Sequence, residues 1–366
     1  MRQKILVLGT LIVFCVPLFS VSPVGAGGIE LDYLVTIENL ENHVAHVKLT
    51  ISKLPTDLDS IYFTMSKPSY YSKQYLKNIK ITSGALLSGP SAENYKWLVR
   101  VATENSASII IEYDTEQLIE SKWSENRYYS YVGDDFAVIG GQYLFLKPEF
   151  IRYSSIVVRF EVPSGWAVIA PWREIGNAYE IDSTYSFWNR VAIGPFTTTQ
   201  KTVNNITLMV ANYNSTSLPI PAEEVLDGMG KLIEFYGQAF GLNTREKIIL
   251  IAAPSPIYYA MTLGNTIVVD TTLLTKNKFW ETTAHECVHL WNANTSYTHE
   301  NADWFSEGGA DYFADMANLH TGLLSKSDLE IFDAWNYYKT YIQFADESMV
   351  GSSDTKIVYD KGELVT

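Results

Sequence analysis

Residues 281–294, ETTAHECVHLWNAN, carry two histidines four positions apart, with a glutamate directly after the first. If this stretch is helical, His285 and His289 lie about one turn apart and their imidazole rings face the same side. Two imidazoles in that arrangement can supply two ligands to a zinc ion. Glu286 is rotated by about 100° around the helix axis. It can therefore reach a metal-bound water, as the general base does in an H-E-x-x-H site. The stretch predicts a metal-binding helix, and the alternative is an amphipathic helix with incidental histidines.

A catalytic zinc ion needs a third protein ligand and an open position for water. Residues 302–320, ADWFSEGGADYFADMANLH, read as a second helix and offer Glu307 as that ligand. Asp311 lies four residues later on the same face, where it could accept the outer N–H of a ligating histidine and fix its tautomer. The alternative for Glu307 is a solvated acid near a helix start, where acids are favoured.

The two stretches together resemble a known group of enzymes. HECVHLWN followed by WFSEGGADYF, with Glu307 eighteen residues after His289, is similar to the gluzincin metallopeptidases. The most similar groups are the glycyl aminopeptidase and aminopeptidase N families, which share the tryptophan that stands here as Trp291. The resemblance implies a peptide or protein substrate and one zinc ion (Zn2+) per chain, held by His285, His289 and Glu307. It also implies that Glu286 is the catalytic base.

A third match lies near the end of the sequence. In residues 356–366, KIVYDKGELVT, Tyr359 is similar to the tyrosine of a Y-x-K-G segment in these families. The family tyrosine donates a hydrogen bond to the tetrahedral oxyanion, so the resemblance implies that catalytic role for Tyr359. A phenol aimed at developing charge stabilises the transition state selectively. The alternative is an ordinary tyrosine at a helix start, one of the 24 in the chain.

The chain departs from both aminopeptidase families upstream of the histidines. Those families use a glutamate there to bind the free amino terminus of the substrate. In the matching residues 256–270, PIYYAMTLGNTIVVD, Thr262 stands about where that glutamate should be, and residues 247–269 contain no acid. We therefore expect endopeptidase-like action, with Thr262, Gly264 and Asn265 binding the substrate. The edge of NTIVVD is expected to pair with an extended peptide backbone. An aminopeptidase with a differently placed anchor is the alternative.

Hydrophobic patterning predicts an α+β fold. Residues 29 to about 200 contain alternating or β-branched segments such as HVAHVKLTIS and SSIVVRFEV, which are typical of strands. Further along the chain, ITLMVANY, KIILIAAP and NTIVVD read as strands. A helix is expected between Pro221 and Gly241, and the chain looks helical from Lys276 onward. We predict a β-rich, sandwich-like N-terminal domain followed by a thermolysin-like domain with a mixed sheet and helices. The predicted limits are 1–26 for a signal peptide, 27–200 for the β-rich domain and 201–366 for the metallopeptidase domain, which is expected to be incomplete at the C-terminus.

The first 26 residues have the pattern of a secretory signal peptide. Arg2 and Lys4 precede an apolar run that is shorter than the ~20 residues of a membrane-spanning helix, and small residues follow it. We therefore expect a secreted, extracytoplasmic or cell-surface protein with no membrane span in the mature residues given. Without the signal peptide the chain has 25 basic and 41 acidic residues, a net charge of -16 instead of -14. This balance argues against nucleic acid as a partner. Cys287 is then the only cysteine, which excludes an internal disulfide.

Two other functions are compatible with the same residues. The first is a hydrolase that uses the metal site on a non-peptide substrate. The second is a non-catalytic peptide-binding surface protein, with which the missing upstream glutamate is compatible. The intact ligands, base and tyrosine argue against a degenerate binder, because binding alone requires none of these catalytic groups.

Overall fold

The computed structural model describes residues 28–329, apart from loops that interrupt this range, and the isolated residues 343 and 348. The predicted signal peptide and Tyr359 therefore lie outside the described residues. No helix in the part of the chain so described is both long and apolar enough to cross a membrane. The residues left out within the range are 39–43, 57, 66–75, 90–95, 102–107, 117–130, 133, 150, 242–244, 255–259, 273–274 and 293–302.

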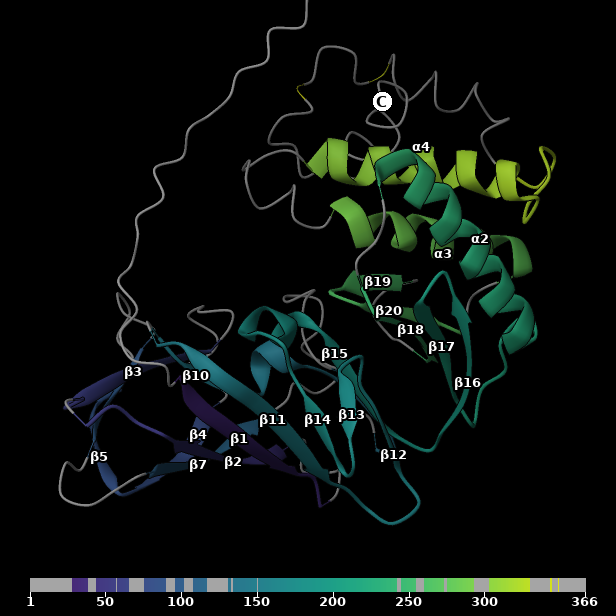
Figure 1. Cartoon of the computed structure of the whole chain (residues 1–366). Coiled ribbons are helices and arrows are strands. Elements are labelled where there is room, and N and C mark those ends of the chain that lie inside the picture. The colour runs from purple at the N-terminus through teal and green to yellow at the C-terminus, as the bar shows by residue number, and fades with distance from the viewer. Residues whose placement is uncertain are drawn as a thin grey trace, which may run out of the picture.

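The front half of the described chain is built almost entirely from strands (Figure 1). Strand β1 (Ile29–Thr36) shows the alternation expected from the sequence, because Leu31, Tyr33 and Val35 are buried while the residues between them are partly exposed. It lies in the middle of a seven-stranded sheet, the largest among the described residues. In spatial order the strands are β13 (Arg173–Ile175), β14 (Ala178–Glu180), β11 (Tyr153–Glu161), β1, β2 (Val44–Ser52), β7 (Ser108–Glu116) and β4 (Leu76–Thr82).

Two four-stranded sheets share one hydrophobic core with this large sheet. The core joins Val47 of the large sheet to Phe63 and Val191 of the two smaller ones. Tyr33 also crosses the core, and its buried hydroxyl donates a hydrogen bond of 2.6 Å to the carbonyl of Leu146. The first small sheet consists of β10 (Leu146–Pro148), β3 (Ser60–Met65), β6 (Trp97–Val101) and β5 (Gly84–Ser88). The second consists of β12 (Ala167–Ile169), β15 (Arg190–Gly194), β9 (Ala137–Gly140) and β8 (Tyr131–Val132), with the short helices η2 (Gly141–Tyr143) and η3 (Thr184–Trp188) beside it in the chain.

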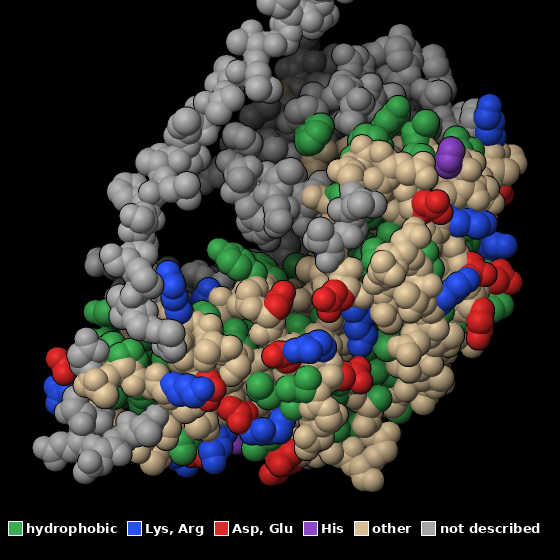
Figure 2. Space-filling view, viewed as in Figure 1, with side chains coloured by type: hydrophobic (Ala, Val, Ile, Leu, Met, Phe, Trp, Pro, Cys, Tyr) green, Lys and Arg blue, Asp and Glu red, His purple; other side chains and the backbone are tan. Residues whose placement is uncertain are grey.

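Surface charges contribute little to holding this fold. On the face shown in Figure 2, Lys and Arg side chains are interspersed with Asp and Glu side chains. Exposed pairs such as Arg159–Asp32, at 2.6 Å, are typical of the described surface. Such pairs contribute about 0–1 kcal/mol each. The buried apolar cores are therefore the main source of stability.

The rear half contains a mixed five-stranded sheet. Its three central strands run parallel to one another, and both outer strands are antiparallel to their neighbours. Parallel sheets are usually buried by the elements packed against them, and here helices pack against one face of the sheet. In spatial order the strands are β16 (Phe196–Val203), β17 (Ile206–Tyr213), β18 (Lys247–Ala253), β20 (Thr266–Asp270) and β19 (Ala260–Leu263).

The strand order corrects one expectation from the sequence. NTIVVD forms β20, which is flanked by β18 on one side and β19 on the other. Both of its edges are therefore occupied, and the prediction that it pairs with a substrate backbone is wrong. The terminal strand of this sheet, within the described residues, is β19, a four-residue segment that the sequence pattern did not reveal.

Three helices stack on one side of this sheet, α2 (Ala222–Phe240), α3 (Lys276–Asn292) and α4 (Asp303–Thr321) (Figure 1). Pro221 directly precedes α2, and Gly241 directly follows it with a φ of 100°, a conformation that glycine adopts easily. The face of α2 that packs in the core is an apolar stripe. It comprises Val225, Met229, Leu232, Ile233 and Tyr236.

Close contacts with α2 fix the position of α3. A Cβ atom at Gly228 would lie only 2.0 Å from the Trp280 ring, so glycine is required where the two helices approach. One turn along α3, the buried Tyr236 hydroxyl donates a hydrogen bond of 3.0 Å to the carbonyl of Ala284. Ala284 directly precedes His285, so these contacts hold the backbone that carries the first histidine.

A β-rich front followed by a mixed sheet with helices agrees with the α+β fold class predicted from the sequence. The domain limits at residues 26 and 200 stay predictions. Strand β16 runs from Phe196 to Val203 and already belongs to the rear sheet.

Candidate metal centre

His285 and His289 lie one turn apart on α3, and both side chains are largely buried, with 13% exposure each. Their rings are nearly perpendicular, with an interplanar angle of 78°. The two Nε2 atoms lie 3.1 Å apart. The helical spacing thus brings the same nitrogen of each ring to one point, as the sequence predicted.

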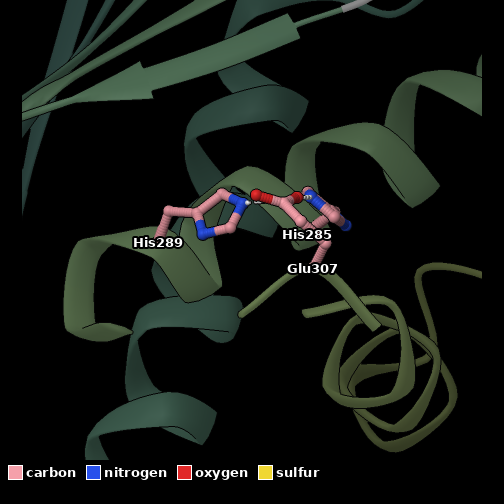
Figure 3. Close-up of side chains that lie close together, drawn as sticks. All are labelled: His285, His289 and Glu307. Carbon is pink, nitrogen blue, oxygen red and sulfur yellow. Dashed lines mark hydrogen bonds and ion pairs between the residues drawn. The ribbon is translucent and has the colours of Figure 1, made fainter. Parts of the chain in front are cut away.

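Glu307 reaches this point from α4, and Figure 3 shows its carboxylate between the two imidazole rings. Its Oε2 atom lies 3.2 Å from Nε2 of His285 and 3.4 Å from Nε2 of His289. Ligand atoms about 2.0–2.1 Å from a tetrahedral zinc ion lie about 3.3–3.4 Å from one another. The three atoms therefore already have the mutual spacing that a single zinc ion requires. Two histidines and a glutamate are also a known ligand set of catalytic zinc, which leaves one position open.

Asp311 orients His285 from the far side of its ring. The carboxylate Oδ1 accepts a hydrogen bond of 2.6 Å from Nδ1 of His285. A proton on Nδ1 leaves Nε2 with its lone pair, and Nε2 is the atom that faces Glu307. The structure thus places Asp311 where the sequence predicted it, one turn after Glu307 on α4.

The charges around the site favour a cation. Burial lowers the pKa of His285, but the charge and hydrogen bond of Asp311, together with Glu307, outweigh burial and hold that pKa well above its usual value. For Glu307, burial raises the pKa, but the hydrogen bonds and charges of both histidines outweigh burial and bring it well below its usual range. Asp311 and Glu307 thus stabilise positive charge at this point, carried by protons on the histidines or by a metal ion that replaces those protons.

Glu286, the predicted base, is buried on α3 with 7% exposure. Its Oε2 atom has no hydrogen-bond partner among the described residues. Buried carboxylate oxygens normally have a hydrogen-bond partner. We therefore expect a water molecule or a substrate group to bond to this atom. The backbone carbonyl of Glu286 accepts a hydrogen bond of 2.8 Å from the Thr262 hydroxyl. The edge strand β19 is thereby bonded to the residue that carries the predicted base.

The three predicted substrate-binding residues have different surroundings. Thr262 lies against α3, as described above, whereas Gly264 and Asn265 form the turn between β19 and β20. Asn265 contacts Asn189 and Arg245 rather than the metal group. Substrate binding by these residues stays a prediction. The contact with Asn189 was missed, because nothing in the sequence around residue 189 indicated it.

Exchange of Asp311 for asparagine should weaken zinc binding. Asp311→Asn keeps the size of the side chain but removes the charge that supports His285. We expect zinc affinity to fall roughly 10–100-fold, as changes to residues behind a ligand usually do. A competition titration with a chelator measures this, with Asp315→Asn on the same helix as the matched control. Unaltered affinity in Asp311→Asn would reduce Asp311 to a helix-surface acid.

One known domain family matches the front of the chain. Residues 32–189 match the Peptidase M61 N-terminal domain. This match covers strands of all three front sheets and ends at Asn189. No match was found among curated proteins.

Solved structures resemble the chain over most of its length. An aminopeptidase N family protein from Idiomarina loihiensis has a TM-score of 0.67 at 15% identity, and the match covers 92% of this chain and 65% of that protein. The M1 zinc metallopeptidase from Deinococcus radiodurans has a TM-score of 0.58 at 13% identity, with 92% and 81% covered. A mutant of the Deinococcus protein bound to a Tyr-Ser-Ala substrate has a TM-score of 0.56 at 12% identity, with 92% and 81% covered. The present chain thus spans just under two thirds of the Idiomarina protein.

The M61 match and these neighbours support a gluzincin-like peptidase, the class that the sequence predicted. At 12–15% identity the structural likeness establishes the fold and not the reaction. The reaction has to be argued from the residues of this chain.

Proposed function

We propose that this protein is a zinc-dependent metallopeptidase that cleaves peptide bonds. His285, His289 and Glu307 would hold one zinc ion per chain. The observation that carries the proposal is the spacing of their three ligand atoms, 3.1, 3.2 and 3.4 Å apart. When bound, zinc polarises a carbonyl group and lowers the pKa of water toward about 7.

The residues around this centre have distinct roles in the proposed reaction. Glu286 accepts the proton of the attacking water through its unpartnered carboxylate oxygen and passes it to the leaving amine. Asp311 holds the proton on Nδ1 of His285 and so keeps that ring in its ligand tautomer. Tyr359, which lies outside the described residues, is proposed from the resemblance alone to donate a hydrogen bond to the oxyanion.

We further propose that internal peptide bonds are cleaved. An aminopeptidase needs a carboxylate to pair with the α-ammonium group of its substrate, because a charge-assisted contact places the first peptide bond at the reactive centre. At the matching position this chain has Thr262, whose hydroxyl donates a hydrogen bond to the backbone carbonyl of Glu286. A neutral hydroxyl engaged in that way competes poorly for a cation.

The second candidate is an aminopeptidase whose anchor lies elsewhere in the chain. It is supported by the mutant of the Deinococcus relative that has been solved with a Tyr-Ser-Ala substrate, and by a mutant M1 zinc metallopeptidase that has been solved with the amino acid L-tryptophan. The rear half is proposed to be a thermolysin-like catalytic domain, since it combines a mixed sheet, an antiparallel edge strand and two helices that carry the ligands.

Blocking the amino terminus of the substrate separates the two candidates. We expect an N-acetylated peptide to be cleaved about as fast as its free-amine twin, because no carboxylate is expected to bind the ammonium group. Mass spectrometry of the products, with and without a chelator, gives the cleaved bond and the metal dependence together. If acetylation slows cleavage a hundredfold or more, an increase of about 2.7 kcal/mol in activation free energy, the protein is instead an aminopeptidase. The absence of cleavage of any peptide would favour a non-catalytic peptide-binding protein or a hydrolase with another substrate.

An extracytoplasmic location is proposed from residues 1–26 alone. A charged start, an apolar run and small residues at a cleavage point support it. Amino-terminal sequencing of the protein recovered from its natural source tests this proposal. An intact residue 1 in the mature protein would contradict it.

A further inference from the structure

The edge strand of the rear sheet belongs to a tight hairpin. Strands β19 and β20 pair with Leu263 opposite Thr266, so that only Gly264 and Asn265 form the turn. Gly264 has a φ of +60°. A glycine with positive φ at the first of two turn residues is typical of a type II′ hairpin, which ties the two strands closely.

The front half of the chain binds this turn through Asn189. This side chain is buried, with 4% exposure. Its Oδ1 atom accepts a hydrogen bond of 2.5 Å from the backbone N–H of Asn265, and its Nδ2 donates one of 2.9 Å to the carbonyl of Ser186. A Cβ atom at Gly264 would lie 2.4 Å from the same Oδ1. Glycine at position 264 therefore serves the contact as well as the turn.

A second bond lies beside the first. The backbone N–H of Arg190 donates a hydrogen bond of 3.0 Å to the Thr266 hydroxyl. That hydroxyl is fully buried and donates in turn to the carbonyl of Leu263 at 2.7 Å. Buried, satisfied bonds of this kind hold a single geometry, because breaking one leaves an unpaired polar group.

The opposite side of the hairpin is bonded to α3. Thr262 donates to the carbonyl of Glu286 at 2.8 Å. The hairpin therefore lies in a chain of hydrogen bonds that leads from Asn189 in the β-rich front, through β19, to the residue that carries the predicted base.

We propose that Asn189 and Thr262 are positioning residues that fix the β19–β20 hairpin between the front half of the protein and helix α3. The β-rich front thereby sets the distance between the edge strand and Glu286. This role rests on the proposed peptidase function. The proposed role also accounts for a threonine at position 262, where the related families have a glutamate. A hydroxyl can donate a hydrogen bond to the Glu286 carbonyl, whereas a carboxylate cannot.

The first test uses Asn189→Ala, which removes both side-chain bonds at the turn. Asn212→Ala is the matched control, because its half-buried side chain also donates one bond to a backbone carbonyl, Thr216 at 3.0 Å, but does not touch the hairpin. We expect Asn189→Ala to keep its zinc and to lower kcat/KM roughly 10–100-fold, since small misplacements near the reacting groups are costly. Amide hydrogen exchange should become faster in residues 260–270 and also in residues 281–292. The control should show neither effect.

The second test removes the hydrogen bond between Thr262 and the backbone carbonyl of Glu286. Thr262→Val keeps the shape of the side chain but removes its hydroxyl, whereas Thr262→Ser keeps the hydroxyl. We expect the valine variant to match Asn189→Ala in kcat/KM and in exchange at 281–292, and the serine variant to restore both.

Two outcomes would overturn the proposal. In the first, Asn189→Ala loosens residues 260–270 but leaves kcat/KM and residues 281–292 unchanged, so that Asn189 only stabilises the turn. In the second, Thr262→Val behaves like the wild-type protein. Lack of peptide cleavage by the wild-type protein would refute the peptidase function instead, and the exchange measurements would still test the link.

Discussion

Glu286→Gln should bind zinc like the wild-type protein and lose about 10²–10⁴-fold in kcat, the usual contribution of a general base. Glutamine keeps the length and polarity of the side chain but cannot accept a proton at neutral pH. The proposed ligand atoms belong to His285, His289 and Glu307, so the exchange leaves the proposed metal site unaltered. The buried, unpartnered Oε2 of Glu286 is the atom whose basicity is lost.

Glu281→Gln is the matched control for this variant. It makes the same substitution on the same helix, at a carboxylate paired with Lys278 at 3.1 Å. A partly exposed pair of this kind contributes little, so kcat should not change. Zinc content by elemental analysis and kcat on one peptide substrate give the answer. Normal kcat in Glu286→Gln would exclude Glu286 as the base and leave the proton transfer unexplained.

The sequence could predict which side chains gather at the candidate metal site, because local geometry sets most of their positions. Two pairs four residues apart, His285 with His289 and Glu307 with Asp311, need only a helix to share a face. What joins the two pairs is the packing of α3 on α4, which the sequence could not specify. The resemblance to the gluzincins supplied that link.

Long-range contacts account for what the sequence missed. Asn189 and Asn265 are 76 positions apart, and a hydrogen bond between a side chain and a distant backbone N–H leaves no periodic pattern. Strand β19 is only four residues long and half-buried throughout, so it shows no alternation either. Because β19 was not recognised in the sequence, β20 was wrongly predicted to have a free edge. Longer strands such as β2 and β11, at nine residues each, were predictable for the opposite reason.

Removal of one histidine should abolish zinc binding altogether. His289→Ala deletes the Nε2 atom that lies 3.1 Å from His285 and 3.4 Å from Glu307. Three protein ligands are the usual minimum for a catalytic zinc ion, and the two that remain span only one edge of the tetrahedron. We expect zinc content to fall from about one ion per chain to near zero after dialysis against a chelator that leaves the wild-type protein loaded.

The fold should survive this change, which keeps the result interpretable. His289 contributes a polar ring to the metal group, whereas α3 is held to α2 by the Gly228–Trp280 contact and the Tyr236–Ala284 bond. His320→Ala is the matched control, since it removes an exposed histidine on α4 that lies outside the metal group. Circular dichroism should be unchanged in both variants, and zinc should be lost only from His289→Ala. Full zinc occupancy in His289→Ala would mean that the metal binds elsewhere, and the proposed reaction would then have no catalytic centre in the residues described.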